Sequence, residues 1–356
     1  MVVEKKNLDI NKVVYSSIER CNFGTLKHPN NKLCLLLCFS NGIQIWDLSS
    51  SESNENHDFQ QIFSLKNNIN QIRLIKFLPP PELEDDEKSP FHQKRPIVLL
   101  ASDLKIFFFS LKTNSEVEMD DLKFGGKIIS IFANPSNVLF STKNKIYLFE
   151  SNNFKLIEEK EIFESPEVPI PPIAFGKRWY AIPSPILIPE IHKQVLEEKI
   201  EQQKNDPKKN NSGNSSISFW TNTLYNWGDM GREKLQNYIY DQKEENPTSG
   251  IVQIFDSKTL QNISHFKAHK HKLTNLAFDN SETLLVTSSD GHNINVFRIH
   301  PANSPYTSHI HIYSMRRGFT NAKIHTINFT DDSRWISIST ARGTNRKRKK
   351  KKRKKY

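Results

Sequence analysis

A short alternating apolar segment that ends in an aromatic residue recurs five times along this chain. The copies read IQIW at 43–46, IFFF at 106–109, IYLF at 146–149, VQIF at 252–255 and INVF at 294–297. Their aromatic ends are separated by 63, 40, 106 and 42 residues. Apolar residues at every second position are typical of β-strands, because successive side chains of a strand point to opposite faces. The recurrence predicts an all-β chain built from repeated units.

The two long gaps between copies each contain a polar insertion. The first, at 79–95, is rich in proline and charge (PPPELEDDEKSPFHQKR), and the second, at 191–248, is rich in asparagine and lysine. Without these insertions the long gaps approach the length of the short ones. A period of about 40 to 45 residues with four short strands is typical of propeller blades of the WD type. We therefore expect a β-propeller over residues 1–344, and an irregular all-β fold without radial symmetry is the alternative.

Turn residues between the apolar segments divide the chain into six sets of strands. We expect strands within 32–42, 42–48 and 59–65; 72–78, 96–103, 104–111 and 116–124; 128–133, 137–142, 145–151 and 154–162; 173–177, 178–184, 250–257 and 262–269; 273–281, 283–291, 293–300 and 309–315; and 324–333 and 334–344. The sixth set stops at a polybasic tail, 345–356.

The second insertion contains one segment with a helical pattern, at 217–240. One apolar face of an amphipathic helix is approximated by Phe219, Trp220, Leu224, Trp227, Leu235 and Tyr238. Such a helix either packs back on the propeller or lies on a membrane surface, where aromatic residues and flanking lysines are favourable.

The positive charge of the chain is concentrated in the tail. The formal net charge is +11, and residues 346–355 (RKRKKKKRKK) supply ten of the 50 lysines and arginines. The remaining basic residues nearly balance the 39 acidic ones. We therefore expect a nearly neutral folded body with a basic tail that could contact an anionic membrane, or nucleic acid, or act as a nuclear localisation signal.

The sequence contains no apolar run of the length of a membrane span and no apolar stretch typical of a signal peptide at its start. We expect a cytoplasmic or nuclear protein. Its cysteines, Cys21, Cys34 and Cys38, are too few for a disulfide framework, so we expect them to be reduced and mostly buried. Cys34 and Cys38 should point to the same face of one strand.

No enzyme is expected, because the sequence has no Gly-rich phosphate loop, nucleophile elbow or HExxH motif. We expect no catalytic residue, no cofactor and no metal site. The histidines at 269, 271, 309 and 311 alternate with lysine and isoleucine, which we interpret as strand surface rather than a metal site.

The segments KAHKHKLTNLAFDNSETLLVTSSDGHNINVFRIHP at 267–301 and IYSMRRGFTNAKIHTINFTDDSRWISISTARGT at 312–344 resemble the PROPPIN family of phosphoinositide-binding propellers. Within it they are most similar to the branch that carries the breast-carcinoma-amplified-sequence-three domain and to plant autophagy relatives. The segment LYNWGDMGREKL at 224–235 is similar to the long blade-four insertion of that branch. The resemblance is specific over about 250–344 and weaker over 30–190.

The resemblance implies a seven-bladed propeller that binds two headgroups at its rim through the Arg316-Arg317-Gly318 turn, one arginine to each. Consecutive residues of an extended segment point to opposite sides, Gly318 allows the backbone to turn, and a guanidinium suits phosphate. By position in the family pattern, the first pocket would add His269, Thr287 and Ser289, and the second would add Ser339, Thr340 and Thr344. For His269, bracing a strand is the alternative role. Where the family continues past blade six, this chain has NRKRKKKKRKKY, so we expect a propeller truncated within blade six.

The predicted function is that of a scaffold that reads phosphatidylinositol 3-phosphate-type lipids in autophagy or membrane trafficking. Its partners would be phosphoinositide membranes and autophagy or trafficking proteins, and its location the phagophore, autophagosome or endosome surface. Two alternatives stay open. The chain could be a protein-interaction propeller without lipid binding, or a nuclear protein directed to nucleic acid by its tail.

Overall fold

The computed structural model describes residues 12–24, 29–39, 42–49, 59–66, 72–81, 89–165, 168–186, 249–290, 293–300, 305–316, 323–340 and 345–349. For Arg316 and 345–349 it describes the backbone alone. The chain divides into two compact units, residues 1–171 with 175–180 and residues 172–174 with 181–356. No helix among the described residues has the length and apolar character needed to cross a membrane.

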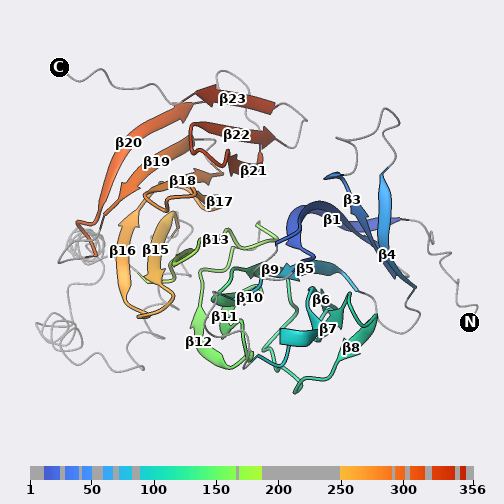
Figure 1. Ribbon diagram of the computed structural model, residues 1–356. Coiled ribbons are helices and arrows are strands. Elements are labelled where there is room, and N and C mark those ends of the chain that lie inside the picture. Colours follow the sequence, from blue (N-terminus) through green and yellow to red (C-terminus); the bar gives the residue numbers. More distant parts are fainter. Residues whose placement is uncertain are drawn as a thin grey trace, which may run out of the picture. The chain divides into compact units, whose positions relative to one another are not determined.

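The described strands form six sheets, five with four strands and one with three (Figure 1). In the first unit they are β1 (Val13–Asn22), β2 (Asn31–Phe39), β3 (Gly42–Asp47) and β4 (Gln60–Lys66); β5 (Leu74–Leu78), β6 (Ile97–Ala101), β7 (Ile106–Ser110) and β8 (Ser115–Val117); and β9 (Ser130–Ala133), β10 (Asn137–Ser141), β11 (Lys145–Glu150) and β12 (Leu156–Glu161).

The fourth sheet contains β13 (Ala174–Phe175), β14 (Trp179–Pro183), β15 (Ile251–Asp256) and β16 (Asn262–Lys267). The fifth contains β17 (Leu273–Phe278), β18 (Leu284–Ser289), β19 (Asn293–Ile299) and β20 (His309–Arg316). The sixth contains β21 (Ile324–Phe329), β22 (Trp335–Thr340) and β23 (Asn345–Lys349). Every sheet runs in chain order from one edge to the other, which confirms the predicted blade pattern.

The core of the second and third sheets is rich in phenylalanine. Phe140 is fully buried between Phe124 and Phe149, at ring-centroid distances of 5.3 and 5.6 Å. Phe108 meets Phe154 edge to face at 4.5 Å. Such edge-to-face pairs add to the large apolar area that each ring removes from water. Aromatic residues of the repeated segments, such as Phe108 and Phe149, therefore pack with phenylalanines outside those segments to hold this part of the first unit together.

The first sheet presents a cysteine-containing face to the second sheet. Cys34 and Cys38 of β2 are both fully buried, next to Ile45 of β3 and Ile75 of β5. All three cysteines are unpaired and buried, as expected. Burial raises the pKa of the Cys34 thiol to about 11 and that of Cys38 to about 12, so both remain protonated and poorly nucleophilic at neutral pH.

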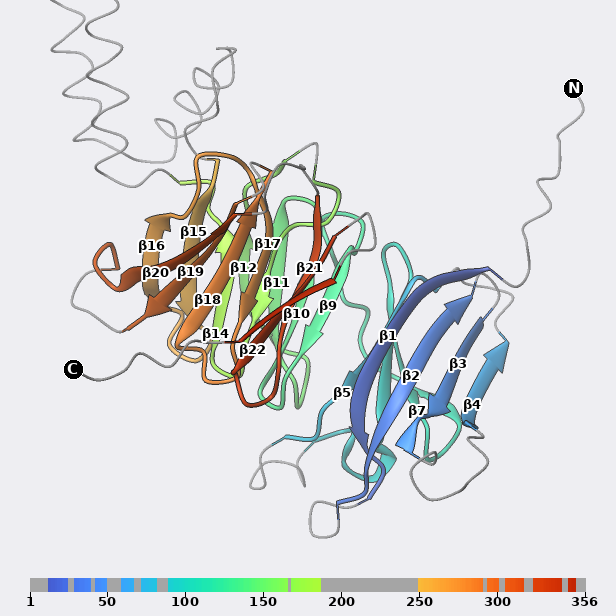
Figure 2. The same ribbon diagram turned by 90° about the horizontal axis from the view of Figure 1, so that it is seen from above.

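The fifth and sixth sheets share a smaller aliphatic core in the second unit. It contains Val286, Ile294, Val296, Met315, Ile324, Ile327 and Ile338. Two side-chain bonds also join these sheets, because Asn275 Nδ2 donates to the His325 carbonyl at 2.9 Å and Asn280 Nδ2 donates to the Asp331 carbonyl at 2.7 Å. The view from above shows the arrows of the two sheets side by side (Figure 2).

The structure differs from the strand predictions at four points. The first sheet has an additional strand, β1, whose polar residues Ser16, Ser17, Glu19 and Arg20 interrupt the apolar alternation expected of a strand. The predicted strand 116–124 is only three residues long, Ser115–Val117. Asn345–Lys349, assigned to the tail, pairs with β22 through its backbone. His269 and His271 follow β16 instead of lying on a strand, and His269 is buried.

The insertions are described only in part. In the first, Phe91 precedes a 3₁₀ turn at His92–Lys94 and is fully buried against Phe108 and Phe154. That end of the 79–95 segment is thus anchored in the core of the first unit. The second insertion, 191–248, and its predicted helix at 217–240 lie outside the described residues.

Candidate functional site

One end of the β17–β20 sheet brings together the first predicted group of headgroup ligands. The strand registers pair Leu273 with Ser289, and Asn293 with Arg316. Ser288 pairs with Ile294, so that Ser289 and Asn293 stand one step further along the same strands. Ser289, Asn293 and the backbone of Arg316 therefore occupy one row across three neighbouring strands. The remainder of the Arg-Arg-Gly turn, Arg317 and Gly318, lies outside the described residues.

His269 and Thr287 form a buried pair behind this row. His269 Nε2 lies 2.8 Å from Thr287 Oγ1. Asn295 Nδ2 donates to the Ala268 carbonyl at 2.9 Å and lies 3.5 Å from His269 Nδ1. An amide NH₂ next to Nδ1 makes that nitrogen the acceptor, so Nε2 carries the proton and donates to Thr287. The imidazole thus connects the segment after β16 to the middle of β18.

Burial lowers the pKa of His269 to about 4; the hydrogen bond with Thr287 opposes this shift, and His311 and His271 add to it. The imidazole is therefore neutral at physiological pH, because desolvation disfavours its charged form. A neutral ring that is already hydrogen-bonded at both nitrogens fixes the position of β18. It does not present a free charge to a ligand.

Ser289 is the polar group in this row whose hydroxyl has no partner. Its Oγ is buried and has no hydrogen bond to any described residue, and it lies two residues along β18 from Thr287 on the same face of the strand. The hydroxyl of the intervening Ser288 is bonded to Thr274 Oγ1 at 2.8 Å. Buried hydroxyls are rarely left unbonded, since desolvation of such a group costs about 1–3 kcal/mol. Ser289 therefore has a spare donor at the end of the strand where Arg316 stands.

The second predicted group lies on β22 of the sixth sheet. Ser339 Oγ lies 2.5 Å from Thr326 Oγ1 on the neighbouring strand, and Thr340 is buried. Ser339 pairs through its backbone with Thr326 and with Asn345 of β23. Adjacent residues point to opposite faces, so Ser339 and Thr340 belong to different sides of the sheet. Thr344 lies outside the described residues.

The sequence did not identify Asn293 and Asn295 as parts of this region. Both stand on β19, where Asn293 belongs to the row of Ser289 and Asn295 supports His269. The available signal was the polar alternation in NIN at 293–295, since an asparagine between buried isoleucine and valine needs hydrogen bonds.

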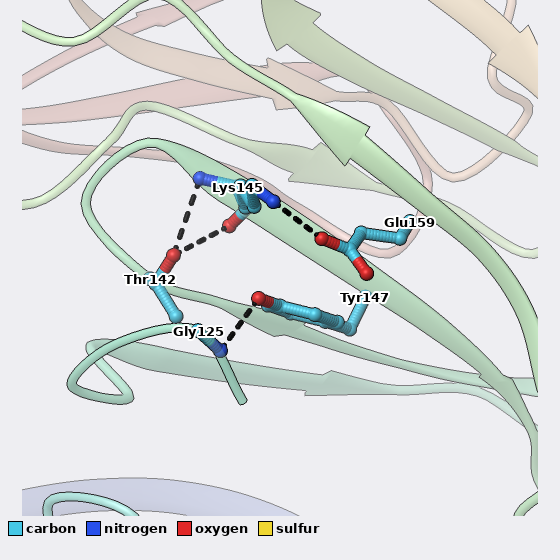
Figure 3. A network of polar contacts seen from close by, with 5 residues as sticks. All are labelled: Gly125, Thr142, Lys145, Tyr147 and Glu159. Atoms are coloured by element: carbon cyan, nitrogen blue, oxygen red, sulfur yellow. Dashed lines mark hydrogen bonds and ion pairs between the residues drawn. The ribbon is translucent and has the colours of Figure 1, made fainter. Parts of the chain in front are cut away.

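A second polar network, in the third sheet, has a structural role (Figure 3). Lys145 and Glu159 form an ion pair at 2.6 Å between β11 and β12. Thr142 Oγ1 accepts from the Lys145 amide at 3.2 Å, and the Tyr147 hydroxyl accepts from the Gly125 amide at 2.8 Å. A Cβ at position 125 would stand 2.9 Å from that hydroxyl, so a larger residue there would require a local shift. The network closes a turn and tethers the loop before β9.

The described part of the chain contains no group of three or more His, Cys, Asp or Glu side chains that could hold a metal ion. Its reactive candidates are also unsuited to nucleophilic chemistry. The three cysteine thiols are buried with raised pKa values, and the one buried serine–histidine contact, between Ser184 Oγ and His265 Nε2 at 3.3 Å, shares its imidazole nitrogen with the Ile186 carbonyl. These groups serve packing and loop positioning.

Comparison with known proteins gives a consistent result. The chain is 28% identical over 363 residues to "Autophagy-related protein 18f" of Arabidopsis thaliana, a match that covers 87% of this chain and 46% of that protein. The chain thus spans less than half the length of this relative.

Two solved propellers share the fold. Kluyveromyces marxianus Hsv2 superposes with a TM-score of 0.55 at 12% identity, over 89% of this chain and 72% of that one. KlAtg21, in a complex with the coiled-coil of AgAtg16, superposes with a TM-score of 0.54 at 14% identity, over 86% of this chain and 74% of that one. Both are PROPPIN β-propellers. The family model for "BCAS3, WD40 repeat" matches residues 3–346, and the chain therefore belongs to this family.

Proposed function

We propose that this chain is a non-enzymatic scaffold that binds phosphatidylinositol 3-phosphate-type headgroups on autophagic or trafficking membranes. Arg316 and Arg317 would each bind one headgroup, and Gly318 would allow the turn between them and the next segment. A guanidinium donates two parallel hydrogen bonds to phosphate oxygens, which an ammonium cannot do with the same geometry.

The observation that carries the proposal is the unpartnered Ser289 hydroxyl at the end of β18. It stands in the row that ends at Arg316, together with the amide side chain of Asn293. A phosphate oxygen held by Arg316 would accept the Ser289 proton and satisfy a buried donor. In this proposal His269 and Thr287 position Ser289 by fixing β18, and Ser289 and Asn293 contact the headgroup.

A second headgroup site would use Arg317 with Ser339, Thr340 and Thr344. Of these residues Ser339 is the one a headgroup could reach, because its side chain is only half-buried. Its hydroxyl is hydrogen-bonded to the hydroxyl of Thr326. A headgroup there would replace that hydroxyl–hydroxyl contact with a charge-assisted one, which is roughly twice as strong. Since two weak sites on one surface combine through their effective concentration, the loss of either arginine should reduce membrane binding greatly.

The relatives support the cellular context of the proposal. The Arabidopsis relative is named for autophagy, and KlAtg21 is seen in complex with a coiled-coil of an autophagy protein. We propose that this chain likewise recruits autophagy proteins to a lipid-marked membrane. The basic tail, 346–355, would add electrostatic attraction to anionic lipids, at about 1 kcal/mol for each Lys or Arg near the surface.

Flotation of the full chain with vesicles tests the proposal. Vesicles of phosphatidylcholine that contain phosphatidylinositol 3-phosphate are compared with vesicles that contain unphosphorylated phosphatidylinositol and phosphatidylserine at equal total charge. We expect preferential binding to the phosphorylated lipid. Replacement of both Arg316 and Arg317 by Thr should abolish the preference and leave only weak binding through the tail.

A matched control replaces two arginines away from the proposed site, Arg178 and Arg334, by Thr, and the lipid preference should survive. Equal binding to both vesicle types by the parent chain would contradict lipid reading and favour a protein-interaction propeller. If binding requires only the tail, and the chain also binds nucleic acid with a steep salt dependence, the nuclear alternative is favoured.

A further inference from the structure

The outer strand of the fifth sheet differs from the outer strands of the other described sheets. β20 ends the order β17–β18–β19–β20 and is 8 residues long, His309–Arg316, and Figure 1 shows it as the outermost arrow of its sheet. None of the strands that the structure describes pairs with its outer side. An edge strand carries a row of backbone N–H and C=O groups that can pair with another chain.

The middle of β20 is exposed and apolar. Ile310 is 52% exposed and Ile312 is 44% exposed, and neither a charged residue nor a proline occurs between His309 and Met315. The register also shifts by one residue between Val296 and Phe297 of the neighbouring strand, which leaves Ile312 without a cross-strand partner. Two large aliphatic side chains thus stand in water beside an open edge, where each loses the stabilisation that burial would give.

Other outer strands carry the features that normally prevent edge pairing. β12 reads LIEEKE and has four charged residues, β8 is only three residues long, and β4 begins with two exposed glutamines and ends in an exposed lysine. β16 has its central residues buried. Charge, short length and coverage protect edges against unwanted pairing, and among the described residues the middle of β20 has none of these protections.

The exposed Arg298 beside β20 indicates that a partner segment carries a negative charge. It is the exposed residue of β19 and lies directly opposite Ile310 in the register, so the two side chains share one face of the sheet. No ion pair of Arg298 occurs among the described residues, whereas exposed basic residues elsewhere, such as Arg73, Lys127 and Lys143, are paired with carboxylates. A carboxylate on an added strand would meet Arg298 across Ile310.

We propose that the outer edge of β20 binds an extended segment of a partner protein, which adds a strand to the β17–β20 sheet. The segment has apolar or β-branched side chains at alternate positions, to cover Ile310 and Ile312, and a carboxylate that pairs with Arg298. Backbone hydrogen bonds supply the affinity, and the alternate side chains supply the specificity. This site uses neither arginine of the headgroup motif and does not depend on the proposed lipid function.

A fluorescent peptide, acetyl-Glu-Val-Thr-Val-Thr-Val-Thr-Glu, which is as long as β20, serves as the probe in anisotropy titrations against the full chain. We expect saturable binding, and slower amide hydrogen exchange in β20 than in β12 when the peptide is present. Ile312→Lys should weaken binding about tenfold or more, because a charge at the centre of an edge opposes strand addition. Arg298→Gln should weaken it about threefold, as the loss of one cross-strand charge pair predicts.

Leu156→Lys is the matched control, since Leu156 lies on the outer strand β12 and is 46% exposed. Its affinity for the peptide should equal that of the parent chain, and all variants should keep the parent's melting temperature because the altered side chains are exposed. Equal affinities of the parent and Ile312→Lys, or protection of another strand, would overturn the proposal. So would concentration-dependent dimers in sedimentation that Ile312→Lys abolishes without any peptide binding, which would make a second copy of this chain the occupant.

Discussion

The third sheet and the fifth sheet follow the same four-strand pattern but are held together in different ways. In the third, Phe140 and Phe149 are part of an aromatic core that also contains Tyr147 and Phe154. In the fifth, the second half of β18 is polar and buried, and Thr287, Ser288 and Ser289 are less than 4% exposed. Apolar packing needs only shape and area, whereas a buried polar strand needs a partner for every donor. β18 leaves the Ser289 hydroxyl unsatisfied, and this strand lies next to the proposed headgroup site.

The aromatic core should show the largest effect on stability. Phe140→Ala removes a fully buried ring that contacts three other aromatic residues, so we expect a loss of about 3–5 kcal/mol in the free energy of unfolding. Urea denaturation followed by fluorescence measures it. Phe59→Ala is the control, because Phe59 is more than half exposed, and it should change stability by about 0.5 kcal/mol or less. Similar losses in the free energy of unfolding for the two variants would contradict the stabilising role of the aromatic core.

The hydrogen-bonded pair of His269 and Thr287, the polar brace of the fifth sheet, should show an intermediate effect on stability. His269→Ala leaves the buried Thr287 hydroxyl without its partner, which should cost about 1–3 kcal/mol. Replacement of both residues, His269→Leu with Thr287→Val, should recover part of that loss because no donor is then left unbonded. A double variant less stable than either single one would contradict this account of the brace.

The brace also predicts a dependence of stability on pH. The pKa of His269 is about 4 in the folded chain and about 6.5 in an unfolded one. The unfolded state therefore binds the proton more readily, so this stability is complete above about pH 6.5 and is lost progressively as the pH falls through 4. His309, whose pKa burial also lowers, contributes in the same direction. His269→Gln should make the denaturation midpoint less sensitive to pH between 6.5 and 4, and an unchanged pH profile would contradict the buried neutral imidazole.

The smallest effect is expected at the exposed ion pair of the third sheet. Lys145 and Glu159 are 2.6 Å apart, but both side chains reach water, where Coulomb attraction is screened and the ordering of two long side chains opposes it. Lys145→Gln should leave the denaturation midpoint unchanged within error. A clear decrease of the midpoint would show that the ion pair in Figure 3 contributes to the stability of the fold and contradict the small effect expected.

The sequence predicted the blades because their strands carry alternating apolar residues, and it missed the elements that lack this signal. β1 has no regular apolar alternation, because Ser16, Ser17, Glu19 and Arg20 interrupt its apolar residues, and β23 contains a run of Lys and Arg that pairs through its backbone. A side-chain pattern cannot reveal pairing that depends on backbone groups alone.

The candidate site was predictable only as a set of residues. The resemblance identified His269, Thr287 and Ser289 together, but their roles depend on distances across the fold. His269 meets Thr287 although 18 positions separate them, and it uses both ring nitrogens there, while Ser289 on the same strand has no partner. Sequence spacing does not distinguish a satisfied donor from an unsatisfied one, so the bracing role of His269 and the free hydroxyl of Ser289 required coordinates.

The most direct test of the central claim is calorimetric titration of the chain with inositol 1,3-bisphosphate, the soluble headgroup of the expected lipid. The Lys and Arg residues of 346–355 are first replaced by Gln, so that tail electrostatics do not contribute. We predict saturable binding that persists at moderate salt, weakens with Ser289→Ala and with either Arg316→Ala or Arg317→Ala, and vanishes when both arginines are replaced. If this chain does not bind the headgroup, or if replacement of both arginines leaves binding unchanged, the Arg-Arg-Gly turn beside β18 does not read a phosphorylated headgroup.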